Sequence, residues 1–387
     1  MLFRSIRVIV KQSSGGSATV EEDGSVSVSN GGSASSPDPI TVDSGSTLSS
    51  SSGTPRRMTF SDDGTKLFVL EHGSDTITTH NLGTAYDIST QTLSVTGTTL
   101  ASNPHSSGMA YGIEFSTDGT KMFTSDIYTG YVYQWNLSTA WDVSSATLST
   151  SDNLNTISLF GVTSSNGNYN RDITFSEDGT KLFILGSDET VHQISLGTAW
   201  DLSSYQTPDI EKDLSSSLTD TYVNSISFSP NGKKMFINRY NKNIFEFSLA
   251  TAWDLSSTVT YIDSLSVQSE DTVPVEIQFN NDGTKMYIAG VAGQDINEYT
   301  LSTAFDISST VTHKGSYSLV SSDAYPTGFS FNNDGTKLFT TGATYDRVNE
   351  HSLTTPFSLV DVSGEHSGDV IDTSNTDTYE DRKSTRL

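Results

Sequence analysis

Four charged residues occupy matching positions just before a phenylalanine that returns along the chain. Arg57, Asp172 and Glu276 each stand three residues before it, and Glu114 stands one residue before it. Because side chains alternate across a strand, these positions share the face opposite the phenylalanine. Carboxylates gathered on such a face could bind a divalent cation or a small polar ligand. A water-filled channel lined by solvated acids is the alternative.

A second set of polar and aromatic residues lies in segments that differ from one repeat to the next. Variable segments on a rigid scaffold commonly carry binding specificity, and Tyr together with Arg suits contact with a protein or a glycan. Drift in unconstrained loops is the alternative explanation. We expect the ligand-binding residues of this face to be His72, Asp126, Tyr128, Tyr169, Arg171, Arg239, Tyr240, Tyr345 and Arg347.

No arrangement of residues in the sequence dictates a reaction. The seven histidines are scattered, and we find no zinc-protease helix motif, nucleophile elbow or glycine-rich phosphate loop. The chain has no cysteine, which removes disulfides and thiolate chemistry. A net charge of −25 with 21 basic residues argues against binding to nucleic acid or to anionic lipid. The sequence therefore favours a binding protein over an enzyme, with no catalytic residue and no cofactor other than a divalent cation.

The elements that position these residues come from one phrase that occurs six times, first as Phe-Ser-Asp-Asp-Gly-Thr-Lys at residues 60–66. A period of 51 to 60 residues with strand-type content predicts an all-β propeller of four-stranded blades. Alternating apolar residues before the phenylalanine predict an inner strand, and the Asp-Gly pair predicts a hairpin turn. The opening phenylalanines are Phe60, Phe115, Phe175, Phe228, Phe279 and Phe331.

A second aromatic residue marks a fixed corner after the third strand of every unit. We expect it to wedge between adjacent blades, the alternative being a ring of carbohydrate-stacking side chains. The aspartate that follows it in five units is expected to cap a turn. We expect the lysine beside each Asp-Gly turn to lie over the neighbouring acid as a solvated ion pair. The corner aromatics are Tyr86, Trp141, Trp200, Trp253, Phe305 and Phe357.

The spacing of the repeats also predicts how the ring closes. Ile40 precedes Phe60 by the same 20 residues that separate the outer strands of the fourth and fifth units from their next phenylalanine. The segment from Ile40 therefore has the position of an outer strand without a blade, and we expect it to complete the sixth blade. The prediction is six four-stranded blades closed by an N-terminal strand. Seven blades, the last one truncated, are the alternative.

The composition divides the chain into three parts. Residues 1–38 are expected to form a flexible Ser/Gly-rich leader, residues 39–362 the propeller, and residues 363–387 a C-terminal tail. Residues 381–387, Asp-Arg-Lys-Ser-Thr-Arg-Leu, match the translation of a common sequencing adapter, so we interpret them as an artefact.

The phrase Phe-Ser-x-Asp-Gly-Thr-Lys-Leu-Phe resembles the blade repeat of TolB-type and lactonase-like bacterial propellers, over roughly residues 40–359. These families include scaffolds, binding subunits and hydrolases, so the resemblance implies a fold and leaves the activity open. Our leading hypothesis is a non-enzymatic binding or structural propeller that contacts a partner protein or glycan on a cell or virion surface. The alternative is a lactonase-like or other hydrolase with a metal ion in the central channel near Glu114, Asp172 and Glu276. We expect an extracellular or surface location without membrane insertion. The sequence contains no recognisable signal peptide and gives no indication of the oligomeric state.

Overall fold

The chain divides into two compact units, residues 1–38 and 39–387. In the first unit, β1 (Ser17–Val20) pairs antiparallel with β2 (Val26–Ser29). The flexibility and the outer boundaries assigned to the leader and the tail stay predictions, and residues 361–387 lie outside the described part of the chain. The computed structural model describes residues 17–20, 26–29, 40–49, 54–72, 74, 76–99, 110–127, 130–149, 153–155, 170–218, 223–240 and 242–360.

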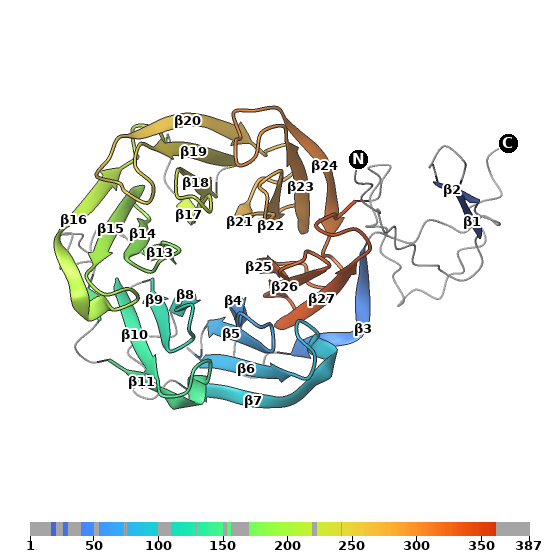
Figure 1. Cartoon of the computed structure of the whole chain (residues 1–387), viewed down its shortest axis with the longest axis horizontal. Coiled ribbons are helices and arrows are strands. Elements are labelled where there is room, and N and C mark those ends of the chain that lie inside the picture. The colour runs from blue at the N-terminus through green and yellow to red at the C-terminus, as the bar shows by residue number, and fades with distance from the viewer. Residues whose placement is uncertain are drawn as a thin grey trace, which may run out of the picture. The chain divides into compact units, whose positions relative to one another are not determined.

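The second unit is a β-propeller whose six blades are antiparallel sheets arranged around an axis (Figure 1). Each blade begins with an inner strand that ends on the repeated phenylalanine, as predicted. The first three blades comprise β4 (Thr54–Phe60), β5 (Lys66–His72), β6 (Thr76–Leu82) and β7 (Gln91–Thr99); β8 (Ala110–Phe115), β9 (Lys121–Asp126), β10 (Tyr131–Leu137) and β11 (Ala146–Leu148), with β12 (Leu154–Asn155) also paired to β10; and β13 (Asn170–Phe175), β14 (Lys181–Gly186), β15 (Thr190–Leu196) and β16 (Tyr205–Asp213).

The last three blades repeat this order and close the ring. They comprise β17 (Val223–Phe228), β18 (Lys234–Arg239), β19 (Asn243–Leu249) and β20 (Val259–Ser266); β21 (Pro274–Phe279), β22 (Lys285–Gly290), β23 (Asp295–Leu301) and β24 (Val311–Ser318); and β25 (Pro326–Phe331), β26 (Lys337–Gly342), β27 (Arg347–Leu353) and β3 (Ile40–Ser49). The N-terminal strand β3 lies antiparallel to β27, with Ile40 opposite Leu353. The predicted closure is confirmed, and the ring has six blades.

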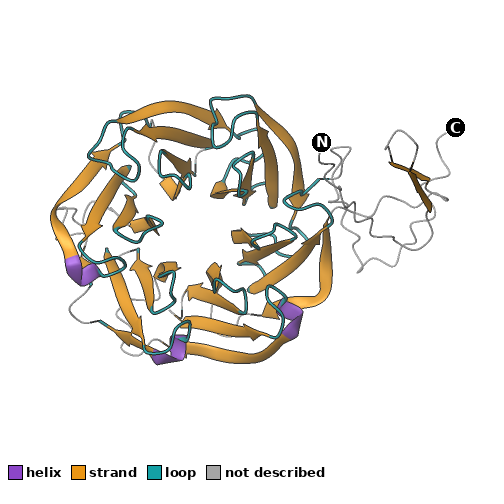
Figure 2. Ribbon diagram, viewed as in Figure 1, coloured by secondary structure: helices purple, strands orange, loops and turns teal. Residues whose placement is uncertain are grey.

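Among the residues that the structure describes, helix is confined to single 3-10 turns at the blade corners: η1 (Ile88–Thr90), η2 (Val143–Ser145) and η4 (Leu202–Ser204) (Figure 2). The preceding aspartates cap these turns, as expected, since the carboxylates of Asp87, Asp142 and Asp201 accept hydrogen bonds from backbone N–H groups. Within the described residues, none of the helices has the length and apolar character needed to cross a membrane.

The corner aromatics hold each hairpin turn in place. Tyr86 has φ 56°, and its backbone N–H donates to the carbonyl of Gly64 at 2.8 Å. Gly64 has φ +68°, and a Cβ at this position would lie 2.2 Å from the Tyr86 ring. Both the positive φ and the close approach of the ring therefore require glycine in the turn. The corner aromatic also contacts the neighbouring blade: the ring centroids of Trp141 in the second blade and Phe68 in the first lie 6.2 Å apart. The predicted wedge between blades is therefore confirmed.

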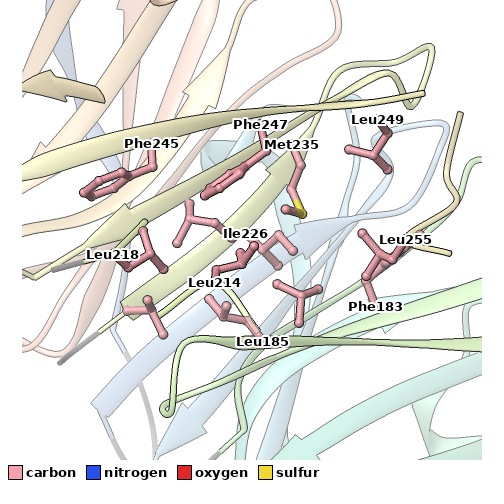
Figure 3. Packing of buried hydrophobic residues seen from close by; sticks show 13 residues of the cluster. Phe183, Leu185, Leu214, Leu218, Ile226, Met235, Phe245, Phe247, Leu249 and Leu255 are labelled. Atoms are coloured by element: carbon pink, nitrogen blue, oxygen red, sulfur yellow. The ribbon is translucent and has the colours of Figure 1, made fainter. Parts of the chain in front are cut away.

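Between blades, an aromatic residue of the second strand meets the inner-strand phenylalanine of the next blade. The ring centroids lie 4.6 or 4.7 Å apart at all six junctions. Figure 3 shows the core between the third and fourth blades, where Phe183 and Leu185 of β14 face Ile226, Met235 and Phe247. Each such buried side chain contributes roughly 1.5–3 kcal/mol relative to exposure, which makes the junctions the main source of the ring's rigidity.

A polar contact repeats at five of the six junctions. The fourth residue of the third strand is Gln or Glu, and its side chain accepts a hydrogen bond from the backbone N–H two residues after the corner aromatic of the next blade. We call this contact the junction hydrogen bond. Its partners are Gln134 with Leu202, Gln193 with Leu255, Glu246 with Ile307, Glu298 with Leu359 and Glu350 with Ile88, at 2.6–2.7 Å. The first blade has Thr79 at this position, and its buried hydroxyl has no hydrogen-bond partner.

The lysine beside each turn does not lie over the turn acid, and the expectation of a local ion pair is wrong. The Nζ of Lys66 instead donates to the carbonyl of Trp141 in the next blade at 2.8 Å. Lys285 makes the corresponding contact with Phe357 at 2.6 Å and also lies 2.7 Å from buried Glu298. The turn aspartates accept instead from their own Ser and Thr neighbours, as Asp63 does from Thr65. The lysines of five blades therefore contact the next blade, whereas Lys337 pairs with Glu350 of its own blade.

Candidate functional site

Every inner strand contains a β-bulge at the same place. Pro55 pairs with Glu71 and Arg57 with Leu70, which leaves Arg56 as an extra residue in β4. Because a bulge inserts one residue, it changes the face to which the following side chains point. The bulged residue is the fourth before the phenylalanine in each blade: Arg56, Tyr111, Arg171, Asn224, Val275 and Thr327.

The six bulged residues surround the axis and line one cavity of about 310 Å³, which we call the mouth cavity. It opens on the face where the first strands begin and the second strands end, since Thr54 lies opposite His72. This is the face that carries the variable loops, which we call the loop face. The lining is completed by Arg57, Tyr240, Tyr325 and Pro326.

Three guanidinium groups give the mouth cavity a positive character. The Arg56 guanidinium lies over the Tyr111 ring, 4.2 Å from its centroid, and donates a hydrogen bond to the Tyr111 hydroxyl. Burial alone would raise the pKa of Tyr111, yet the nearby charges of Arg56, Arg57 and Arg171 outweigh burial and lower it. The positive charges of all three arginines therefore act on the Tyr111 hydroxyl.

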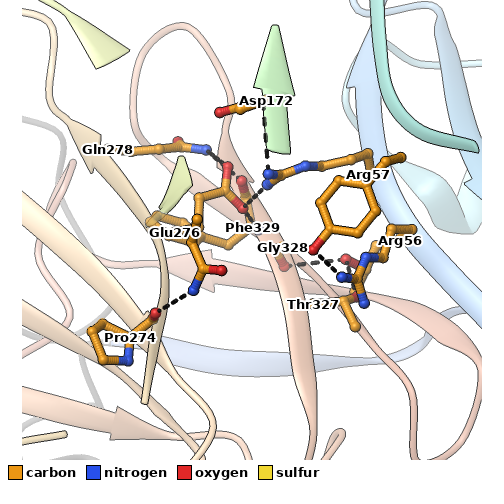
Figure 4. A network of polar contacts seen from close by, with 12 residues as sticks. Arg56, Arg57, Asp172, Pro274, Glu276, Gln278, Thr327, Gly328 and Phe329 are labelled. Atoms are coloured by element: carbon orange, nitrogen blue, oxygen red, sulfur yellow. Dashed lines mark hydrogen bonds and ion pairs between the residues drawn. The ribbon is translucent and has the colours of Figure 1, made fainter. Parts of the chain in front are cut away.

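Arg57 forms the floor between the mouth cavity and the channel beneath it, because it lines both. Its guanidinium lies 3.1 Å from Glu276 and 3.9 Å from Asp172 (Figure 4). Burial would lower the pKa of Arg57, but these two carboxylates raise it above its usual value. The acids are held in turn by the backbone of adjacent inner strands, since Asp172 accepts from Ile226 at 3.0 Å and Glu276 from Phe329 at 3.2 Å.

The channel below has a volume of about 390 Å³ and contains the remaining predicted acid. Burial and the nearby Asp172 raise the pKa of Glu114 to about 8, so its carboxyl group is largely protonated at pH 7. Burial likewise raises the pKa of Asp172 to about 6, although Arg57 opposes the change. Arg57, Glu114, Asp172 and Glu276 lie together around the axis, as their matching positions before the phenylalanine predicted.

These residues make a poor site for a divalent cation. A cation between Asp172 and Glu276 would have to displace the Arg57 guanidinium, which already forms ion pairs with both carboxylates. A protonated Glu114 lacks the charge that a hard cation requires. Over the described part of the chain, no group of three or more His, Asp or Glu side chains is arranged to hold a metal ion. The divalent cation stays a prediction.

Of the nine residues predicted for the loop face, the mouth cavity contains Arg171 and Tyr240. Arg239 is buried, and its guanidinium lies 3.7 Å from Glu189 of the third blade, so it joins two blades. Asp126 is also buried. The remaining members lie outside the lining: His72 at the end of β5, Arg347 stacked 4.6 Å from the exposed ring of Tyr345, and Tyr128 and Tyr169 beyond the described residues.

Arg56, Tyr111 and Asn224 were missed because strict alternation assigns them to the buried face with the phenylalanine. The bulge reverses that assignment, and no sequence pattern in a single repeat predicts it. Alignment of the six repeats would have indicated the bulge, because the fourth residue before the phenylalanine is mostly polar where alternation predicts an apolar residue.

No protein-family model matches the chain, and no curated protein matches its sequence. Among solved structures, a protein from Lactobacillus plantarum has a TM-score of 0.54 at 11% identity, over 87% of this chain and 86% of that one. The β-propeller domain of Cps50 (Swd1) from Myceliophteria thermophila has a TM-score of 0.51 at 10% identity, over 82% and 100%. A protein assigned as a 6-phosphogluconolactonase from Bacteroides uniformis has 0.51 at 12% identity, over 76% and 79%.

The protein is thus a six-bladed β-propeller with an arginine- and tyrosine-lined cavity at one end of its axis. Its resemblance to lactonase-like propellers is confirmed at the level of the fold. Identities this low show a shared architecture and carry no activity across.

Proposed function

We propose that the protein is a non-enzymatic binding propeller that takes its ligand at the mouth cavity on the loop face. One observation carries the proposal: six independent inner strands each use a bulge to direct one side chain into the same cavity. Bulges occur often beside functional sites because they re-aim side chains. Because all six bulged side chains point toward the axis, we favour a ligand-binding site over sequence drift in unconstrained loops.

The surroundings of the cavity suit contact with a glycan or a partner protein. Tyr240 and Tyr325 are 46% and 44% exposed, and aromatic rings of this kind supply contact area at little entropic cost. Tyr345, 49% exposed, extends the aromatic surface of the loop face beyond the cavity. Location on a cell or virion surface, predicted from composition, belongs to this proposal.

The hydrolase alternative rests on fold similarity and is the weaker proposal. The group that lies between Asp172 and Glu276 is the Arg57 guanidinium, and Glu114 has a raised pKa, so these acids do not fit a metal-activated water. Metal analysis of the purified protein, with a thermal shift on adding Ca²⁺, tests it. A bound stoichiometric ion would restore the hydrolase hypothesis.

A binding screen against glycans and secreted proteins tests the proposed function, with three exposed tyrosines replaced in turn. Tyr240→Ala should abolish or strongly weaken the binding of any hit, because Tyr240 lines the cavity. Tyr261→Ala is the matched control, since Tyr261 is 42% exposed but lies on the outer strand β20. Tyr345→Ala measures whether the contact extends over the loop face. Loss of binding with Tyr261→Ala alone would place the site elsewhere and overturn the proposal.

A further inference from the structure

The mouth cavity has a charge opposite to that of the protein. The chain carries 46 acidic and 21 basic residues, yet the cavity lining contains three arginines and no acid. Only nine arginines occur in the whole sequence, so a third of them lie at this one site. A protein of this composition concentrates its guanidinium groups at the axis.

The arginines of the lining have different roles. Arg57 is neutralised from below by Glu276 and Asp172 and forms the floor. Arg56 is held by Tyr111, through the ring contact and the hydroxyl, and neither contact supplies a negative charge. Among the residues that the structure describes, no carboxylate lies within 4.0 Å of Arg56. The charge of Arg56 therefore faces the cavity without a counter-ion from the described protein.

A guanidinium group matches the two oxygens of a carboxylate or a similar oxyanion through its planar fork. Arg171 lines the same cavity from the third blade, and the charges of all three arginines together lower the pKa of Tyr111, which lies in the second blade between Arg56 and Arg171. The walls contribute further donors and a rim of exposed tyrosine, suited to the hydroxyl groups and flat faces of a sugar ring.

Size and net charge restrict the ligand further. A volume of about 310 Å³ is at the lower end of small-molecule sites and accommodates one ring-sized group. The net charge of −25 repels a polyanion that covers the surface, whereas a single acidic group within the cavity meets a lining that contains three arginines and no acid. A ligand with one localised negative charge is favoured.

We propose that the mouth cavity binds a single acidic sugar residue, free or at the end of a glycan, through its carboxylate, with Arg56 and Arg171 as the recognition residues. This proposal rests on the proposed function and names its ligand class. Tyr240 and Tyr325 at the rim pack against the sugar ring, and Arg57 forms the floor, where its charge is paired with Glu276 and Asp172.

Isothermal titration of the full chain with glucuronate and with glucose tests the charge requirement. We expect measurable binding of glucuronate, weakening with added NaCl, and affinity for glucose at least tenfold lower. An oligosaccharide ending in glucuronate should bind at least as well as the free acid if the natural source is a glycan. Equal binding of glucose and glucuronate would overturn the acidic-sugar inference while leaving a binding site at the cavity.

Substitutions separate recognition from general electrostatics. Arg56→Gln should weaken glucuronate binding roughly 10- to 100-fold, the usual loss for a charge-assisted hydrogen bond. Arg56→Lys, which keeps the charge and loses the fork, should fall between Arg56→Gln and the parent protein. Arg347→Gln is the control, because Arg347 is an arginine of the same face that stacks on Tyr345 outside the cavity. Equal weakening by Arg56→Gln and Arg347→Gln would refute the cavity as the acid site.

Inorganic sulfate and phosphate provide the last comparison. If either ion binds as tightly as glucuronate and competes with it completely, the cavity is a general oxyanion site and the assignment to a sugar fails. Thermal unfolding of each variant checks that it is folded before its affinity is compared. Weaker glucuronate binding in Tyr240→Ala, with the preference for glucuronate over glucose retained, supports both proposals. Glucuronate binding that is unaffected by Tyr240→Ala and by Arg56→Gln overturns both.

Discussion

The junction hydrogen bond between blades allows a quantitative test of what holds the ring together. Gln193 is 1% exposed, and its Oε1 accepts the buried N–H of Leu255 at 2.7 Å. Replacement by Met keeps the length and apolar volume of the side chain but removes the acceptor. The N–H of Leu255 then stays buried without a partner, which costs about 1–3 kcal/mol. We expect Gln193→Met to lower the free energy of unfolding by this amount.

The chain provides its own control at the one junction without this contact. Thr79 occupies the same strand position in the first blade, and its buried hydroxyl has no hydrogen-bond partner. Thr79→Val replaces that hydroxyl by a methyl group of similar shape, so stability should change by less than about 0.5 kcal/mol or increase. Removal of a polar group is therefore costly at one junction and harmless at the other.

Urea unfolding followed by tryptophan fluorescence, together with thermal scans, measures both variants. For a ring of this size, 1 kcal/mol corresponds to about 1–2 °C, so Gln193→Met should lower the Tm by about 1–6 °C. The slope of the unfolding transition should be unchanged, because the surface exposed on unfolding is the same. Equal stability of Gln193→Met and the parent protein, or an equal loss in Thr79→Val, would refute the assignment of the junction hydrogen bond.

Three further outcomes follow from the structure. Because burial raises the pKa of Glu114 to about 8, the native state holds a proton that the unfolded chain has released between the ordinary pKa and pH 8. The free energy of unfolding in urea should therefore be lower at pH 9 than at pH 5, by up to roughly a few kcal/mol, and Glu114→Gln should remove this difference. Burial lowers the pKa of His351 to about 3, so the imidazole takes up a proton on unfolding at any pH below about 6.5. The free energy of unfolding should therefore fall by ~2 kcal/mol between pH 7 and pH 5, and His351→Gln should show a smaller fall. Gly283→Ala, at φ +71° with its new Cβ 2.1 Å from the Phe305 ring, should destabilise by more than ~1 kcal/mol, whereas Gly197→Ala, whose φ is not positive, should cost less; equal losses would contradict the argument from φ.

The fold was predictable because it depends on features that repeat. The inner-strand phenylalanines, the glycine turns and the corner aromatics each recur six times, and a spacing of 20 residues located the closing strand at Ile40. The axial acids were found by alternation, which holds between Arg57 and Phe60 because the bulge lies before them.

The site was only partly predictable, for a physical reason. Arg56 and Tyr111 reach the axis because a bulge reverses the alternation at the start of each strand, and bulges leave little trace in one repeat. Arg239 is a residue type that often contacts ligands, yet it lies between two blades beside Glu189. Its burial depends on the packing of two distant segments, which local sequence does not encode.

The closing pair of strands has a consequence for how the chain acquires its structure. Within the other five blades all paired strands are close in sequence, so each of those sheets can form locally and early. The pairing of β3 with β27 instead joins residues roughly 310 positions apart, as Ile40 and Leu353 are. Contacts of such long range are slow to form, and until this one is made, β27 presents an open edge to other chains. During synthesis β3 is the first strand of the ring to be made, and it stays unpaired until β27, the last strand of the sixth blade to be made, has been synthesised. We therefore expect ring closure to be the slow phase of refolding and the stage at which the protein is most prone to aggregate.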